Sequence, residues 1–171
     1  KGAALSLRWP RPALSLSDFA SGCWYSPGSC AIFNVEAVRA SGIGQDVELR
    51  RFEDFDWFLA LALAGFSLEI LPIAAVAIAR ERVQSPATAK AAAAYILAKW
   101  HKNKLDSQLL TRVESYMALE EAAACYYAGN YGRAAARLAG SLLLAPRLSL
   151  QLSPGWDRQA VNDVPRHVIE R

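Results

Sequence analysis

The sequence predicts a mixed α/β fold in residues 1–87, followed by an all-helical part. Two observations favour this division. Short apolar runs bounded by turn residues, which are typical of buried strands, occur before Pro86. From Thr88 onward the composition changes to alanine-rich sequence that favours helices. We therefore expect a mixed α/β part over 1–87, a helical hairpin part over 88–152 and an irregular tail over 153–171.

Strands are expected at three places before residue 88: Ala13–Leu16, Cys30–Phe33 and Ser67–Leu71. The second of these follows a turn cluster of Ser, Pro and Gly residues. The third alternates apolar with polar residues, as a half-buried strand does. Ile73–Ala79 is a further apolar run that is either extended or helical.

Helices are expected where apolar or alanine-rich sequence ends at a turn residue. Gly42 should end a short first helix, and Gly65 is a suitable left-handed cap for a second. The expected helices are Val35–Ala40, Phe55–Ala64, Ala89–Lys102, Ser107–Tyr127 and Tyr131–Leu144.

An acidic cluster lies at the start of the second of these helices. Glu53, Asp54 and Asp56 fall within four residues. Asp54 can cap the helix, and the helix dipole favours acids in a first turn. A carboxylate held there stays ionised and can accept a proton from a substrate hydroxyl. The alternative is an ordinary acidic helix start without a chemical role.

The charge distribution indicates no nucleic-acid partner. The net charge is only +3, and the basic residues are scattered. Lys99, Lys102 and Lys104 form the densest basic cluster, around His101. Such a cluster is typical of the solvated end of a helix.

Neither a metal site nor a membrane span is expected from the sequence. The three cysteines lack metal-ligand spacing and favour a reducing compartment, and the two histidines, His101 and His167, lie far apart. Residues Trp57–Ala79 are long enough to cross a bilayer, but Gly65 and Pro72 interrupt them. A helix followed by a buried strand is expected there instead.

Residues from about Ser26 to Ser85 contain five short motifs in a fixed order. These are Pro27–Phe33, Val35–Gly42, Arg51–Trp57, Ala64–Phe66 and Arg80–Ser85. Together they resemble the C-terminal, acceptor-side half of the catalytic domain of family 2 glycosyltransferases. The resemblance implies a partial nucleotide-diphospho-sugar transferase fold of the A type.

The resemblance also implies roles for individual residues in an inverting sugar transfer. Asp54 would be the general base, and Glu53 would help to bind or orient the acceptor. The further substrate-binding residues implied are Asp56, Trp57, Arg80 and Arg82. The two arginines would stabilise the leaving nucleoside diphosphate. Two alternatives stay open: Asp56 as a structural acid bonded to nearby backbone, and the arginines as a solvated basic loop.

The implied whole enzyme transfers a sugar from a nucleotide-sugar donor to a glycan or lipid-linked acceptor, as in bacterial cell-envelope polysaccharide biosynthesis. It would use Mg or Mn, with metal ligands outside this chain, and no metal ligand is expected within it. The chain starts at Lys1 without a methionine and is expected to be a fragment, inactive alone, whose donor-binding half precedes it. The implied location is the cytoplasm, or the inner face of the cell membrane.

Residues from about Ala118 to Pro146 resemble one tetratricopeptide-type helical hairpin. Gly129-Asn130-Tyr131 would be the turn, Ala134 the small residue that permits close helix approach, and Leu138 and Ser141 the inner face. One such unit cannot bury its own apolar side, so it needs a neighbour, for which Ala89–Lys102 is the candidate. The alternative function is therefore a non-catalytic helical protein-interaction module, in which the acidic cluster has no chemical role.

Overall fold

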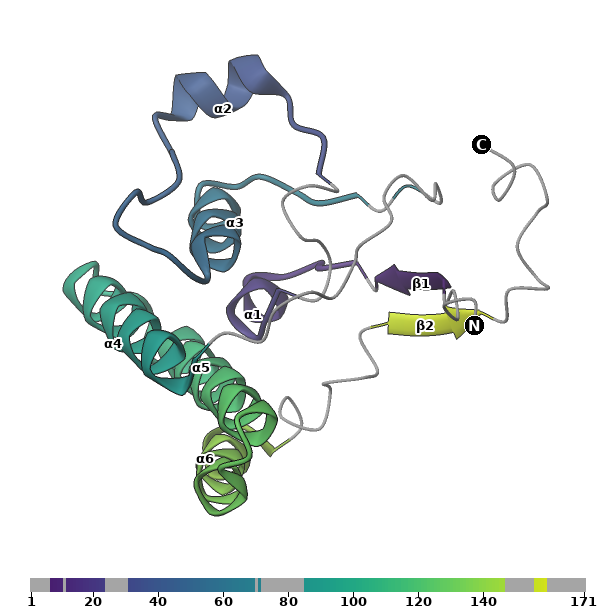
Figure 1. Ribbon diagram of the computed structural model, residues 1–171. Coiled ribbons are helices and arrows are strands. Elements are labelled where there is room, and N and C mark those ends of the chain that lie inside the picture. The colour runs from purple at the N-terminus through teal and green to yellow at the C-terminus, as the bar shows by residue number, and fades with distance from the viewer. Residues whose placement is uncertain are drawn as a thin grey trace.

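The computed structural model describes residues 7–10, 12–23, 31–69, 71, 85–146 and 156–159. Most of them lie in helices (Figure 1). The helices are α1 (Leu16–Ala20), α2 (Val35–Ser41), α3 (Glu53–Leu63), α4 (Pro86–Lys102), α5 (Ser107–Tyr127) and α6 (Tyr131–Leu144). Two short strands, β1 (Leu7–Pro10) and β2 (Trp156–Gln159), pair antiparallel with Leu7 opposite Gln159.

The prediction of an α/β fold is wrong. Among the residues that the structure describes, no strand lies between β1 and β2, and the one sheet is a two-stranded ribbon. An A-type glycosyltransferase needs a mixed sheet ahead of its acidic helix. The predicted resemblance of residues 26–85 to family 2 glycosyltransferases is therefore wrong.

The strands predicted within the first part are also absent where the structure describes them. Residues 13–15 form a loop that leads into α1, and Ser15 and Asp18 make a reciprocal capping box there. This Ser-x-x-Asp signal starts a helix, and it outweighs the short apolar pattern. Residues 31–33, 67–69 and 71 are irregular, whereas Cys30, Ile70 and Ile73–Ala79 lie outside the described residues.

Local signals place α2 and α3 close to their predicted positions. The Asn34 side chain caps α2 by accepting from the Ala37 N–H at 3.1 Å, and Gly42 ends the helix with φ of 69°. Gly65, two residues after the end of α3, has φ of 90°. Glycine adopts this left-handed conformation without the steric cost of a side chain.

The three long helices follow their predicted ranges closely. The bounds of α5 and α6 agree with the prediction, and α4 begins three residues earlier than expected. The earlier start has a local cause, because Ser85 caps the helix and Pro86 occupies its first position. Gly129, with φ of 78°, lies in the turn between α5 and α6.

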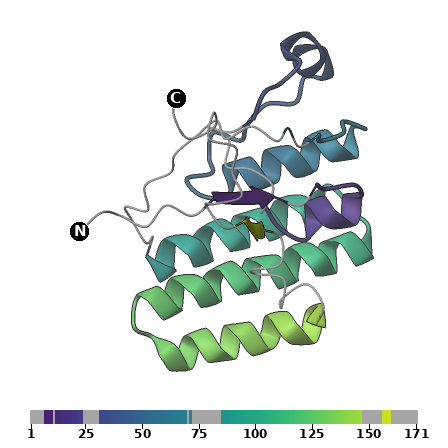
Figure 2. The ribbon, with the colours of Figure 1, turned by 90° about the vertical axis from the view of Figure 1, so that its right-hand side faces the viewer.

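Residues of α1, α3, α4 and α5 form one hydrophobic core, and these helices lie beside one another in Figure 2. Phe55 and Leu59 of α3 pack with Ile96 of α4 and with Val113 and Met117 of α5, all at most 1% exposed. This core contains residues from both sides of the predicted boundary at residue 87. The boundary itself stays a prediction.

Helix α2 lies apart from the helical stack in both views (Figures 1 and 2). None of its residues is buried. Among the described residues, none of the helices has the length and apolar character that a membrane span requires.

Candidate functional site

Asp54, the predicted base, lies in the first turn of α3 and does not cap it. Phe52 occupies the N-cap position with φ of 65°, and no side chain there bonds to the helix end. The Asp54 Oδ1 atom accepts a hydrogen bond from Gln45 Nε2 at 3.3 Å. Glu53 opens the helix beside it, and both side chains are half-buried. The capping prediction is therefore wrong, and the predicted roles of both acids stay untested.

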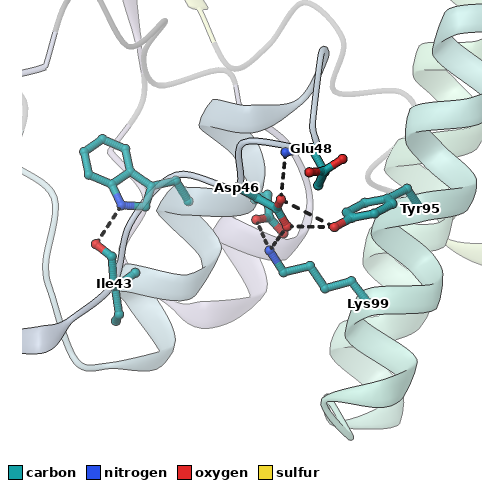
Figure 3. Close-up of polar contacts among 7 residues, drawn as sticks. Ile43, Asp46, Glu48, Tyr95 and Lys99 are labelled. Carbon is teal, nitrogen blue, oxygen red and sulfur yellow. Dashed lines mark hydrogen bonds and ion pairs between the residues drawn. The ribbon is translucent and has the colours of Figure 1, made fainter.

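Asp56, predicted to contact substrate, is instead 2% exposed in the protein interior. Its Oδ2 atom accepts from Lys99 Nζ at 2.6 Å, and the same ammonium donates to Asp46 Oδ2 at 2.7 Å. Figure 3 shows Lys99 reaching from α4 to Asp46. One lysine thus joins α3, α4 and the loop before α3. We call Asp46, Asp56 and Lys99 the lysine bridge.

The Asp46 side chain also stabilises the turn of the loop in which it lies. Asp46 Oδ1 accepts from the Glu48 backbone N–H at 3.1 Å, and the Asp46 carbonyl accepts from the Leu49 N–H at 3.1 Å. These bonds form a tight turn typical of aspartate. The Tyr95 hydroxyl lies 3.2 Å from Asp46 Oδ2 and adds a second contact from α4 (Figure 3).

The two carboxylates differ electrostatically. The hydrogen bond from Lys99 holds the pKa of Asp46 below its usual value. Burial raises the pKa of Asp56, although the hydrogen bond and charge of Lys99 oppose this shift. Burial alone would lower the pKa of Lys99, but the hydrogen bonds and charges of the two carboxylates outweigh it, so that pKa is raised. Lys99 therefore stays charged. The unfavourable desolvation within the lysine bridge acts mainly on the buried carboxylate of Asp56.

The second oxygen of Asp56 is incompletely satisfied. Among the residues that the structure describes, Asp56 Oδ1 and Trp100 Nε1 are buried and make no hydrogen bond of full geometry. The nearby indole N–H still lowers the pKa of Asp56 slightly, because it favours the ionised carboxylate. A buried acid with one strong cation partner is typical of a structural ion pair. The lysine bridge therefore acts as a clamp between elements.

Trp57, another predicted substrate contact, makes two contacts within the protein. Its Nε1–H donates to the Ile43 carbonyl at 3.3 Å, and its ring centroid lies 4.6 Å from that of Phe33. Both contacts hold the segment that carries α2. Arg80 and Arg82, predicted to face a leaving nucleotide, lie outside the described residues.

The sequence interpretation missed Asp46 and treated Lys99 as part of a solvated basic cluster. Lys99 is in fact 27% exposed and paired twice. A spacing signal was present, since Tyr95 and Lys99 lie four residues apart and share one face of α4. No local sequence pattern indicates that Asp46 contacts this face of α4.

The α5–α6 hairpin has a buried polar contact far from its turn. Ser115 Oγ donates to the Ser141 carbonyl at 3.0 Å, and Ser141 Oγ donates to the Ser115 carbonyl at 2.7 Å. Both serines are at most 1% exposed. Ala134 is also buried, whereas Leu138, predicted to lie on the inner face with Ser141, is 37% exposed. Small side chains therefore let the two helices approach closely.

Helix α6 packs on α5 and lies at the lower edge of the stack, with no described helix beyond it (Figure 2). Apart from Arg133 at its edge, the side turned away from α5 carries no charge. We call it the outer face of α6; its residues, all exposed, are Tyr131, Gly132, Ala135, Ala136, Ala139 and Leu143. Next to it, the exposed rings of Tyr126 and Tyr127 lie against each other, with Tyr131 on Tyr126.

No group of three His, Cys, Asp or Glu side chains could hold a metal ion among the residues that the structure describes. No family model matches the chain, and it matches neither a curated protein nor a solved structure.

Proposed function

We propose that the chain is a non-catalytic helical interaction module, in which the stack of α4, α5 and α6 presents the outer face of α6 to another protein. The observation that carries this proposal is that face. Its six residues are apolar or glycine, all are exposed, and Leu143 is 85% exposed.

The packing of helical hairpins explains why such a face favours binding. In a stacked array each helical unit buries one side on its neighbour, and the last unit needs a polar outer side to remain stable in water. The polar Ser141 of α6 points inward at α5, whereas its outer face is apolar. Contiguous apolar patches of this kind mark protein contacts.

Sugar transfer of the predicted kind requires an α/β fold, which the described residues lack. In addition, Asp56 is buried in the lysine bridge, and the Trp57 indole is bonded to Ile43. These side chains support the position of the loop before α3.

Site-specific photo-crosslinking in cells tests the proposal. A photoreactive phenylalanine analogue is placed at Ala139 on the outer face of α6. The matched control is the same analogue at Ala94, an exposed alanine in the middle of α4. We expect a discrete cross-linked protein from position 139 and none from position 94. Equal cross-linking from the two positions, or none from position 139, would contradict the proposal.

A further inference from the structure

We propose that the outer face of α6 binds an amphipathic helix of another protein, with large apolar side chains on one side and acidic residues along its flank. This inference rests on the proposed function and specifies the partner. Three properties of the face lead to it: its shape, its charge and its length.

The shape of the face requires large side chains on the partner. Most of its residues are alanine or glycine, and a Cβ atom built at Gly132 or at the neighbouring Gly140 would meet nothing within 4 Å. The surface is therefore shallow, with room between Tyr131 at one end and Leu143 at the other. A helix fills such a surface when its leucine, isoleucine or phenylalanine side chains enter the spaces above the small residues.

The charge beside the face is positive. Helix α6 contains Arg133 and Arg137 and no acidic residue. Arg137 pairs with Glu121 of α5 at 3.0 Å, and Glu120 pairs with Arg51 at 2.8 Å. Arg133 is exposed and makes no ion pair with any described residue. Acidic residues on the partner would therefore meet an uncompensated positive charge.

The length of the face matches a short helix. Helix α6 has 14 residues, which correspond to roughly 21 Å at the usual rise per residue. A partner helix of about four turns would cover it. The exposed tyrosines at the α5–α6 turn would lie at one end, where they offer apolar rings and hydroxyl groups.

Two other occupants fit the face less well. A second copy of α6 would bring no acidic residue to Arg133, because α6 contains none, and would present mostly alanine and glycine in place of large apolar side chains. A lipid surface gains little from alanine and glycine, since burial in the interface scales with apolar area. The observations therefore favour a helix from a different protein.

A selection experiment tests the inference with the whole chain. A phage-displayed library of 14-residue helical peptides, randomised on one side and its flanks, is selected on the immobilised protein. We expect enrichment of Leu, Ile or Phe on one side and of Asp or Glu on the flank. Enrichment should vanish with Ala139→Glu and persist with Ala94→Glu, the control at an exposed position of α4.

The most enriched peptide then tests the charge argument. Its affinity should fall about tenfold with Arg133→Glu and stay unchanged with Lys90→Glu, since Lys90 is exposed on α4. Circular dichroism of each variant confirms that its helices are retained. An affinity that Arg133→Glu does not change would overturn the acidic-partner inference.

Three further outcomes would also overturn it. These are selection of basic peptides, a dimer of the chain in sedimentation that Ala139→Glu dissociates, and co-sedimentation with phosphatidylcholine–phosphatidylserine vesicles that Ala139→Glu abolishes. Cross-links at position 139 together with a basic peptide pool would leave the proposed function intact and reject only this inference. Absence of both cross-links and selected peptides would reject both.

Discussion

At the scale of single residues, Lys99 connects parts of the chain that local signals do not relate. It bonds to Asp46 in the loop before α3 and to the buried Asp56 in α3. Removing a buried carboxylate from water is costly, and a single ammonium compensates only part of that cost. The raised pKa of Asp56 is consistent with this balance. The bridge therefore fixes which face of α4 meets the loop.

Replacement of Lys99 by methionine should destabilise the fold by about 2–4 kcal/mol at pH 7, because it leaves a buried carboxylate without its cation. The loss should shrink at pH 3. Burial raises the folded pKa of Asp56 above its ordinary 3.8, so its charged form costs stability as pH rises through that folded pKa. Without Lys99 this pKa rises further, and the penalty therefore grows between pH 3 and pH 7.

Urea unfolding at the two pH values measures the effect, with Lys90→Met as the control because Lys90 is exposed on the same helix. Equal destabilisation by the two variants, or a loss that is larger at pH 3, would show that the bridge does not carry the stability attributed to it.

At the scale of elements, the α5–α6 hairpin is held by a polar contact in an apolar setting. Each serine hydroxyl donates to the backbone carbonyl of the other serine, so neither hydroxyl is buried without a partner. Their small size allows close approach of the helices, and their bonds define which residues face each other. The orientation of the outer face of α6 follows from this register.

A double-mutant cycle of Ser115→Ala and Ser141→Ala tests the register contact. Each single change should cost about 1 kcal/mol, since it leaves the partner hydroxyl with fewer bonds. The double variant should cost less than the sum of the two, by roughly 0.5 kcal/mol or more, because the residues share their bonds. Chemical unfolding of the four proteins provides the measurement, and strict additivity would mean that the two serines act independently.

At the scale of the whole molecule, one core unites the segments before and after residue 87. Leu59 of α3 is fully buried and belongs to the same cluster as Val113 of α5. A core shared in this way favours cooperative unfolding of α3 together with α5. The outer face of α6 therefore rests on a scaffold that depends on residues far away in the chain.

Leu59→Ala should lower global stability by about 2–5 kcal/mol through the cavity that it creates. Hydrogen exchange should then show that core amides of α5 lose protection as much as those of α3. Leu63→Ala is the control, since Leu63 lies on the same helix and is 40% exposed. Protection in α5 that survives Leu59→Ala would indicate two independent units that meet near residue 87.

The sequence by itself determined the helices whose ends carry strong local signals. The Asp106 side chain caps α5, and Gly129 in the left-handed conformation separates α5 from α6, so both ranges were predictable. Capping and left-handed glycine act within a few residues, so they can be read without knowledge of the fold. The prediction of a strand at residues 13–16 was wrong, although a helix signal of this kind was present there in the Ser15 capping box.

Only the tertiary structure decided the place of Asp56, one acid of the acidic cluster. Lys99 lies 43 residues after Asp56 and 53 after Asp46, and no local pattern relates positions so far apart. The same sequence of acids fits a catalytic site and a structural clamp, because the outcome depends on which cation the packing of α4 brings to them. Burial and distant pairing are properties of the folded chain, so the sequence could single out Asp56 but not its partners Lys99 and Asp46.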